Sequence, residues 1–518
     1  MKKVIVIGAG PAGLTAAYEL SKYPNEYKVT VIEESNCFGG ISRTVEHNGN
    51  RMDMGGHRFF SKVPEVNAWW EKMMPTQGTP AKDYVTLGKN CGVKQGGPNP
   101  ENTDRVMLLR NRLSRIFFRR KFFNYPITLN FATLKNMGFL TTMEVGFSYL
   151  KSTFFKRQEK SLEDFYVNRF GYKLYSMFFE SYTENLWGRH PKNISPEWGA
   201  QRVKGLSIIV ILKNMLGKVF HTSPRKVETS LIEEFAYPKL GPGQLWEVTA
   251  AESEKNGVEI IMNSKVIKIR KNAENKIIGV EYERNGAVEF LDCDFLISSM
   301  PLKDLVVGMN DVPKKFFDIA AGLPYRDYMT VGVLLNKLNL KNETAIKTVG
   351  NIIPDDWVYV HDKSVKMGRF QVYNNWSPYL VKDVEHTVWM GLEYFCNEGD
   401  EMWSQSDESF ARAAFEEMVK MKLIDSVDEV KDYHVERVKK AYPAYFDTYA
   451  QIEDLREYLN TIPNLFCVGR NGQHRYNNLD HSMCTSFETV KNILSGSTDK
   501  SNIWNVNTEK EYHESAKQ

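Results

Sequence analysis

A glycine-rich turn at residues 8–13, with the sequence GAGPAG, constrains this chain more than any other feature. It follows an apolar segment at residues 4–7 and precedes an alanine-rich segment. Glycines at these spacings permit a tight turn and let the backbone approach a diphosphate, and the first N–H groups of the following helix attract anions. Glu33 and Glu34 lie at the end of the next expected strand, about 20 residues on, where a carboxylate binds ribose hydroxyls. The segment therefore predicts a βαβ unit that binds a dinucleotide.

Two further glycine pairs indicate which dinucleotide is bound. Gly39 and Gly40 precede Arg43, whose fixed charge suits pyrophosphate oxygens, and Gly55 and Gly56 form the second pair. With these motifs the chain resembles, over nearly its whole length, the FAD-binding superfamily of amine oxidases, protoporphyrinogen oxidase, phytoene desaturases and UDP-galactopyranose mutase. The resemblance implies FAD, with its adenosine diphosphate half at the first glycines and its isoalloxazine ring near the last pair.

The resemblance also implies which residues contact FAD. In the superfamily the backbone at the position of Val266 touches adenine, and a closing strand and helix near the C-terminus complete the site. The expected FAD contacts are Gly8, Gly10, Ala12, Gly13, Glu33, Glu34, Gly39, Gly40, Arg43, Gly55, Gly56, His57, Val266, Gly469, Arg470, Asn478, Asp480 and Met483. Cys467 and Cys484 do not lie in the amine oxidase attachment pattern, so we expect FAD to be bound non-covalently.

Length and composition limit the class of protein. With 518 residues, 42% of them hydrophobic, the chain can form two or three lobes. A net charge of +3 gives no support for a nucleic-acid partner. No apolar stretch reaches the roughly 18 residues of a spanning helix, and the run at residues 4–7 is too short for a signal peptide, so we expect a cytoplasmic protein. The cysteine and histidine spacings predict reduced thiols and no metal site.

The pattern along the chain predicts an α/β protein with a Rossmann-like FAD-binding lobe that is discontinuous in sequence. A helical insertion and an antiparallel-sheet substrate lobe interrupt it. The expected divisions are residues 1–75, 231–305 and 456–495 for the FAD-binding lobe, 76–230 for a basic and aromatic hairpin with the helical insertion, 306–455 for the sheet lobe, and 496–518 for a polar tail that frays.

Alternation and periodicity predict the individual elements. Residues 108–127 alternate arginines with aromatics, as in a hairpin with one apolar and one basic side, and residues 129–220 have helical spacing. Strands are expected at residues 257–261, 265–270, 277–283, 295–298, 329–335, 370–373, 387–395 and 465–468, an amphipathic helix at 408–421 and another helix after residue 480.

Four short segments narrow the resemblance to UDP-galactopyranose mutase: residues 56–60 (GHRFF), 125–127 (YPI), 179–188 (FESYTENLWG) and, in part, 475–480 (RYNNLD). In that family reduced FAD acts through its N5 atom, and a nucleotide-activated sugar interconverts between pyranose and furanose forms without net electron transfer. Such chemistry needs cations for a diphosphate and aromatic residues for uracil and sugar. The candidate catalytic residues are His57, Arg202, Tyr182, Trp187, Tyr476 and Arg326, with Arg369 a further contact.

Two other functions suit parts of the sequence. The element at residues 39–44 (GGISRT) is closer to the amine oxidase and protoporphyrinogen oxidase branch, and Met329 stands near the place of a second mutase arginine. These features favour a FAD-dependent oxidase or desaturase. The basic and aromatic stripe at residues 110–123 would suit a non-catalytic, FAD-stabilised scaffold or a protein of the membrane surface. We expect a small-molecule partner, foremost a nucleotide sugar, and leave a homodimer open.

Overall fold

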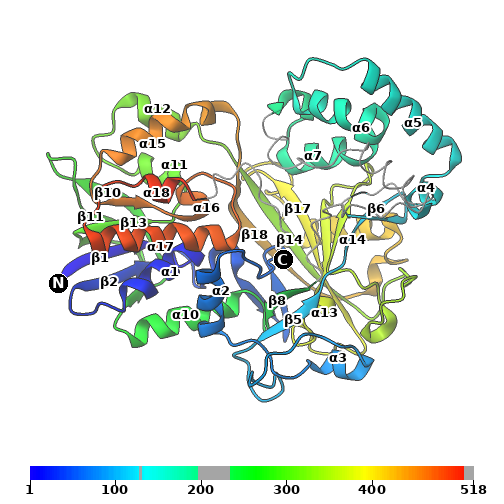
Figure 1. Cartoon of the computed structure of the whole chain (residues 1–518), viewed down its shortest axis with the longest axis horizontal. Helices are drawn as coiled ribbons and strands as arrows, with labels where there is room; N and C mark the ends of the chain where they lie inside the picture. The colour runs from blue at the N-terminus through cyan, green and yellow to red at the C-terminus, as the bar shows by residue number, and fades with distance from the viewer. Residues whose placement is uncertain (126, 128–130, 197–233, 507–518) are drawn as a thin grey trace, which may run out of the picture.

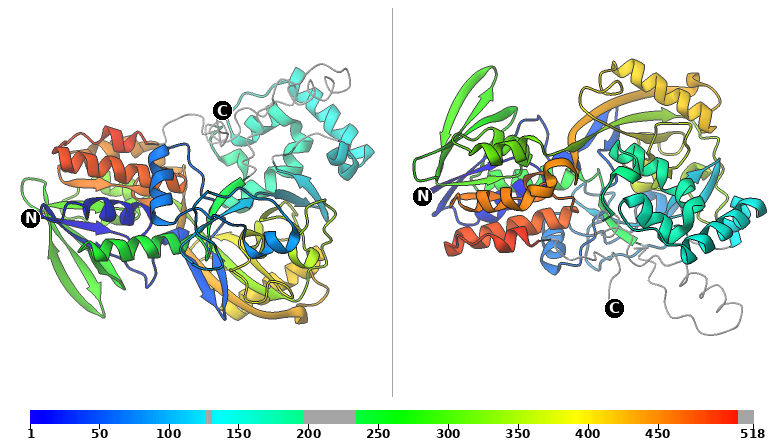
Figure 2. Two further views of the ribbon diagram at one scale, coloured as in Figure 1. Left: turned by 60° about the horizontal axis from the view of Figure 1, so that its bottom comes forward. Right: turned by 90° about the horizontal axis from the view of Figure 1, so that it is seen from above.

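The structure, a computed structural model, describes residues 1–125, 127, 131–196 and 234–506. These residues form three regions, which Figure 1 separates: a sheet with flanking helices at the left, a larger sheet at the right, and a group of helices above the larger sheet. Figure 2 shows from two other directions that this helical group lies at the opposite end of the molecule from the N-terminal strand.

A five-stranded parallel sheet forms the centre of the first region. Its strand order is β19-β13-β1-β2-β9, and all neighbouring strands are parallel. Its short strands are rich in Val, Ile, Leu and Phe because both faces are covered. The strands are β1 (Lys2–Ile7), β2 (Tyr27–Ile32), β9 (Glu259–Ile261), β13 (Phe295–Ser298) and β19 (Leu465–Cys467). Segments from both ends and the middle of the chain therefore build one sheet.

Alternate residues of this sheet contact two different cores. Val4 and Val6 of β1 belong to a core with helices, and Ile5 and Ile7 belong to the core on the opposite face. The first face is covered by α1 (Pro11–Leu20), α2 (Pro64–Met73), α10 (Gly243–Lys255) and α17 (Leu479–Ser495). The second is covered by β10 (Ser264–Lys271), β11 (Ile277–Arg284), β12 (Ala287–Asp292), α11 (Leu302–Val307), α12 (Lys314–Ala321) and α15 (Ile452–Asn460).

A seven-stranded sheet forms the second region. Its order is β18-β14-β17-β16-β15-β6-β7, and its neighbours are antiparallel except β15 with β6. Phe410, Phe415 and Met418 of one helix pack on one face. The elements are β6 (Ser114–Phe118), β7 (Lys121–Asn124), β14 (Tyr325–Leu335), β15 (Trp357–Val360), β16 (Arg369–Val372), β17 (Val388–Cys396), β18 (Val430–Pro443), α13 (Tyr373–Trp376) and the covering helix α14 (Asp407–Met421).

Helices between β7 and β8 form the third region, and short pairs of strands connect the regions. The helices are α4 (Phe131–Met137), α5 (Phe139–Phe154), α6 (Leu162–Phe178) and α7 (Glu180–Trp187). The remaining elements are the strand pairs β3 (Thr44–His47) with β4 (Asn50–Asp53) and β5 (Met107–Asn111) with β8 (Glu234–Pro238), and the short helices α3 (Lys82–Leu87), α16 (Gly469–Gly472) and α18 (Ser501–Trp504). Within the described ranges, no helix has the length and hydropathy that crossing a membrane requires.

The α/β fold class with a parallel nucleotide-type sheet and a second, mostly antiparallel sheet is confirmed. The expected domain boundaries stay predictions. Two local expectations are wrong. Residues 497–506 do not fray, because Ile503 and Trp504 of α18 are buried. The stripe at residues 110–123 is not an exposed apolar surface, because Phe117, Phe118 and Phe123 are buried in the sheet's cores.

Candidate active site

The first two glycine motifs meet at the carboxyl end of β1. Gly8 has a φ of +97°, which residues other than glycine rarely adopt. A Cβ on Gly13 would lie 1.8 Å from the carbonyl oxygen of Gly8, and a Cβ on Gly10 would lie 3.8 Å from Cα of Gly40. No side chain caps the N-terminus of α1, so its first N–H groups are available to an anion. The two turns form a backbone-lined cradle of the kind a pyrophosphate requires.

The carboxylate of Glu33 is held beside this cradle at the end of β2. Its Oε2 accepts a hydrogen bond from the Ala9 N–H at 2.7 Å, and its Oε1 accepts one from the Ser35 N–H at 3.0 Å. Glu34 is exposed. The N–H of Ser264 donates to the carbonyl oxygen of Glu33 at 2.8 Å, which brings β10 with its buried Val266 to the same side. The arrangement agrees with a ribose site at Glu33 and an adenine site along β10.

A cavity of about 130 Å³ lies between the parallel-sheet region and the seven-stranded sheet. Its lining comes from the segment after β4, from α2, from β14, β15, β16 and β18, and from the start of α16 and α17. Seven of the expected site residues meet there with Arg58 and Arg369, so distant parts of the sequence converge on one space. They are Gly55, Gly56, His57, Arg470, Tyr476, Asn478 and Asp480.

His57 enters this cavity as a neutral ring. Its Nε2 lies 2.8 Å from the carbonyl oxygen of Ile41 and 3.2 Å from that of Met54, so Nε2 carries the proton and donates. Burial, and secondly the charge of Arg470, lower the pKa of His57 to about 4. The imidazole is therefore uncharged at neutral pH.

Arg369 is a cavity residue whose charge is already balanced. Its Nε lies 2.5 Å from Oε2 of the fully buried Glu393, and its Nη2 donates to the Tyr442 hydroxyl at 2.8 Å. The guanidinium also lies over the Trp357 ring, 4.6 Å from the centroid. The register of β16 with β17 pairs Arg369 with Glu393 and so places both side chains on one face of the sheet.

Arg470 is a second cavity cation, and its partners are carbonyl groups and rings. It donates to the carbonyl oxygen of Asn477 at 2.7 Å and to that of Ala441 at 3.3 Å, and it lies 4.6 Å from the ring centroid of Tyr476. Tyr476 stacks in turn on Tyr442, with centroids 6.1 Å apart. Within the described part of the chain no carboxylate pairs with Arg470, so its charge can serve an anionic ligand.

Two buried polar atoms in the cavity wall lack a hydrogen-bond partner among the described residues. They are the hydroxyl of Tyr328 and Nε1 of Trp357. Buried polar groups in proteins are nearly always satisfied by protein, water or ligand. The orphaned atoms therefore mark this wall as a binding surface for a polar molecule. The Trp357 ring also packs against Gly56, where a Cβ would lie 2.3 Å from the indole.

Several expected site residues lie elsewhere. Arg326 is buried, donates to the carbonyl oxygens of Leu186 and Asn185, and thereby caps the end of α7 rather than lining the cavity. Trp187 is a core residue of the helical region, and Met483 is buried, where its sulfur accepts a hydrogen bond from Trp70. Arg202 lies outside the described residues.

Two more expected contacts have other partners. Arg43 donates to the carbonyl oxygen of Gly40 at 3.3 Å and lies 3.2 Å from Oε2 of Glu436, so its charge is shared with a carboxylate. Tyr182 stacks on His361 with centroids 4.9 Å apart and meets Tyr359 edge to face. Gly469 has a φ of +74° and packs on Ala12, where a Cβ would lie 2.9 Å from that of Ala12. It thus brings the C-terminal strand against α1.

Sequence reasoning missed Trp357, Tyr442 and Tyr328 as lining residues. Each lies on a strand of the seven-stranded sheet, where aromatic residues are common and alternate with other buried ones. The sequence signal that could have found them is Arg369 with Glu393, since two charged residues inside otherwise apolar strands indicate a paired, buried site.

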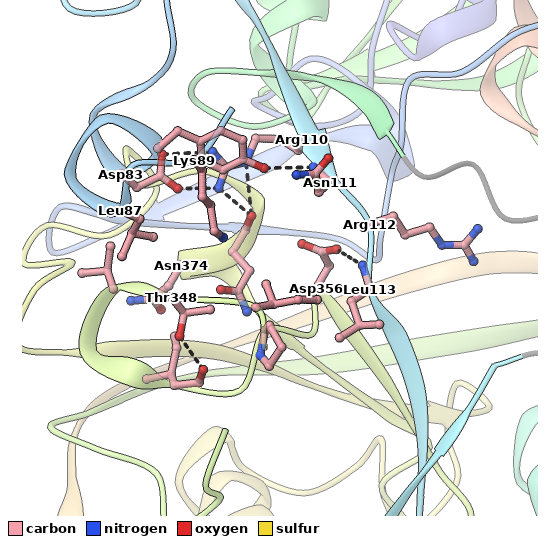
Figure 3. Close-up of a pocket in the computed structure, with 16 residues that line it drawn as sticks. Asp83, Leu87, Lys89, Arg110, Asn111, Arg112, Leu113, Thr348, Asp356 and Asn374 are labelled. Atoms are coloured by element: carbon pink, nitrogen blue, oxygen red, sulfur yellow. Dashed lines mark hydrogen bonds and ion pairs between the residues drawn. The ribbon is translucent and has the colours of Figure 1, made fainter. Parts of the chain in front are cut away.

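A second, smaller cavity of about 50 Å³ lies beyond α3 (Figure 3). On one side Arg110 makes a two-pronged ion pair with Asp83, at 3.0 and 2.7 Å, and both residues are buried. On the other side Oδ2 of Asp356 accepts a hydrogen bond from the Leu113 N–H at 3.0 Å. Burial raises the pKa of Asp356 to about 7, and its Oδ1 has no partner among the described residues.

Comparison with known families decides the affiliation. The sequence pattern of the family described as flavin containing amine oxidoreductase matches residues 11–478. The chain belongs to this family. Membership implies FAD as cofactor and a flavoenzyme as its class, and the glycine cradle with Glu33 fits the pyrophosphate and ribose of FAD.

Two relatives match short stretches of the chain. The chain is 44% identical over 59 residues to 1-hydroxycarotenoid 3,4-desaturase of Flavobacterium sp. (strain P99-3), and 40% identical over 67 residues to protoporphyrinogen oxidase 2 of Arabidopsis thaliana. These matches cover 11% and 13% of this chain and only 12% and 13% of those relatives' own length.

Two solved structures share the fold over nearly the whole chain. Reduced UDP-galactopyranose mutase has a TM-score of 0.74 at 19% identity, covering 99% of this chain and 100% of that one. A redesigned putrescine oxidase has a TM-score of 0.57 at 14% identity, covering 96% and 99%. At these identities the likeness establishes the fold alone.

Proposed function

We propose that this flavoenzyme is a UDP-galactopyranose mutase-like isomerase that interconverts pyranose and furanose forms of a nucleotide-activated sugar. The supporting observation is the lining of the large cavity. Arg470 lacks a carboxylate partner among the described residues, stacked tyrosines adjoin it, and the orphaned Tyr328 hydroxyl and Trp357 indole N–H lie in the same wall. A diphosphate sugar offers charge, rings and hydroxyls to all of these groups, whereas a carotenoid offers no charge to Arg470.

Each residue of the chain has a defined task in this proposal. In this proposal Arg470, which the resemblance gives as a FAD contact, instead holds the diphosphate of the substrate. Tyr476 and Tyr442 provide stacking surfaces for a planar base or the apolar face of a sugar. The neutral His57 keeps the segment after Gly55-Gly56 in place through the Ile41 carbonyl and adds no charge beside the flavin position. FAD, when bound and reduced, supplies the nucleophilic nitrogen N5.

The test is a redox-controlled conversion assay. Purified FAD-loaded protein, reduced anaerobically with dithionite, is incubated with UDP-galactopyranose or its furanose isomer and compared with an oxidised sample by chromatography. We expect interconversion in the reduced sample alone. Absence of both conversion and UDP binding by the reduced protein would rule out the proposal.

A FAD-dependent oxidase or desaturase is the second candidate. It draws on the short but 40–44% identical matches to a desaturase and an oxidase, and on the arginines that could hold carboxylates of an oxidised substrate. This function predicts that the substrate bleaches the oxidised flavin anaerobically. A panel of porphyrinogens, polyenes and amines, monitored by flavin absorbance, separates it from the redox-neutral isomerase.

A further inference from the structure

Helix α5 exposes its most apolar side to solvent. Six large side chains within it are 44–78% exposed, and Phe155 just beyond it is 76% exposed. At 100° per residue these six fall within an arc of about 100°. They are Phe139, Leu140, Met143, Phe147, Leu150 and Phe154. A helix that packs on a protein core normally shows the reverse pattern, with polar residues outward.

The opposite side of α5 is its packing side. Val145 and Ser152 are the buried residues of this helix, and both lie opposite the exposed arc. At Gly171 of α6 a Cβ would lie 2.8 Å from the Tyr149 backbone nitrogen, so the two helices cross closely along the inner side. The Ser148 hydroxyl accepts a hydrogen bond from the Lys173 N–H at 2.9 Å. The outward apolar face is therefore fixed by the fold and is not a loosely attached segment.

Positive charge surrounds this face. Between residues 119 and 157 the chain carries Arg119, Arg120, Lys121, Lys135, Lys151, Lys156 and Arg157 against a single carboxylate, Glu144. Glu144 is paired with Lys173 of α6. Lys135, Lys151 and Lys156 are exposed and make no ion pair within the described ranges, and they stand at the two ends of α5. Unbalanced cations next to exposed Phe and Leu match the composition of helices that lie in the surface of anionic membranes.

The geometry favours a membrane over a second copy of the chain. With 16 residues, α5 is about 24 Å long and about 10 Å wide, so its footprint is on the order of 240 Å². A stable dimer buries about 800 Å² per partner. Two copies facing each other would also bring like charges together, whereas a lipid surface needs only a single convex helix at an end of the molecule. Figures 1 and 2 show α5 in that outer place.

We propose that α5, with Phe155 and its flanking lysines, docks this protein on the surface of a membrane that contains anionic lipids. Phe147 and Leu150 enter the acyl boundary to a depth of about 5–10 Å, while the lysine ammonium groups stay at the level of the phosphates. The contact is peripheral and reversible, and it leaves the large cavity and its flavin site unchanged.

The test is vesicle flotation of the FAD-loaded full chain. Vesicles of phosphatidylcholine with 30% phosphatidylglycerol are compared with pure phosphatidylcholine, at low and at high salt. The test variant is Phe147→Glu with Leu150→Glu. The matched control is Val85→Glu, since Val85 is 66% exposed on α3, far from α5. Flavin absorbance verifies that every variant is folded.

We expect wild type and Val85→Glu to float with the anionic vesicles, and the double variant to lose at least tenfold in bound fraction. High salt and neutral vesicles should each weaken the binding. Flotation that the double variant retains would overturn the proposal. A wild type that does not bind the anionic vesicles would also overturn it. If that wild type is a dimer in light scattering and the double variant is a monomer, the face binds a second copy instead.

Discussion

The two cavities place two arginines in opposite situations. In the small cavity Arg110 is closed off by both oxygens of Asp83, and both side chains are buried. In the large cavity Arg470 has carbonyl oxygens and tyrosine rings around it but no carboxylate within the described residues. A paired arginine stabilises the fold and has little left for a ligand, while an arginine without a counter-charge can bind an anion. The large cavity also holds Arg369, which is paired with Glu393, so an arginine with no carboxylate partner among the described residues is what distinguishes it from the small cavity.

The largest expected effect is on stability, at the small cavity. Arg110→Met leaves the buried Asp83 without its counter-charge, which should lower the free energy of unfolding by about 3–5 kcal/mol. Activity per folded molecule should stay unchanged. Thermal unfolding followed by flavin release measures the loss. The double variant with Asp83→Leu should regain most of it; a double variant as unstable as the single one would show that the pair is not the cause.

Arg470→Met should act on binding instead. No carboxylate is left unpaired, so the thermal midpoint should change little, while the affinity of the reduced protein for UDP should fall about 100-fold, or about 2.7 kcal/mol. Titration of flavin fluorescence with UDP measures this. Arg412→Met on α14, where the side chain is 72% exposed, is the matched control. Equal affinities in the two variants would place the anion site elsewhere.

A third test uses the pH dependence of stability at the small cavity. Asp356 has a pKa raised to about 7 by burial, so between about pH 4 and 7 the unfolded state loses its proton first, and stability falls as pH rises. Asp356→Asn removes this contribution. From pH 5 to pH 8, the free energy of unfolding of the variant should therefore rise by on the order of 2 kcal/mol relative to that of wild type. Denaturation at both pH values measures the gain; a constant difference would mean that Asp356 is ionised throughout.

The smallest effect is expected at Tyr442. Tyr442→Phe removes the hydroxyl that accepts from Arg369, but Glu393 still holds the guanidinium. The loss of stability should be about 1 kcal/mol, and the stacking on Tyr476 should survive. Thermal unfolding and UDP titration together measure both consequences. A loss as large as that of Arg110→Met would show that Arg369 depends on the hydroxyl after all.

The sequence predicted best where backbone requirements are strict. The glycines at 8–13 and Glu33 could be assigned because only glycine suits the turn and because the carboxylate has a fixed place after β2. The strand at 295–298 and the helix at 408–421 were predicted to within one residue by their periodicity. The cavity's aromatic wall was not predicted, since Trp357 and Tyr442 look like ordinary strand residues until the sheet register brings them together.

Several candidate residues taken from the family resemblance have other structural roles. Arg326 has the charge expected of a diphosphate contact, yet its position on β14 directs it to the end of α7. Met483 and Trp187 are buried in cores, where their size and hydrophobicity already account for them. Tertiary contacts over more than 100 residues of sequence decided these cases, and no local pattern encodes such contacts.

The order of the strands in the parallel sheet determines when the sheet can be completed during synthesis of the chain. β1 and β2 lie within residues 2–32, but their neighbour β13 and the outer strand β19 follow only at residues 295–298 and 465–467. At about 5–20 residues per second, synthesis of the intervening stretch takes about 20 to 90 s. Throughout that time β1 and β2, with the glycine turn between them, lack some or all of the strands that complete their sheet. The five-stranded sheet that flanks the expected FAD site is therefore complete only after most of the chain has been translated.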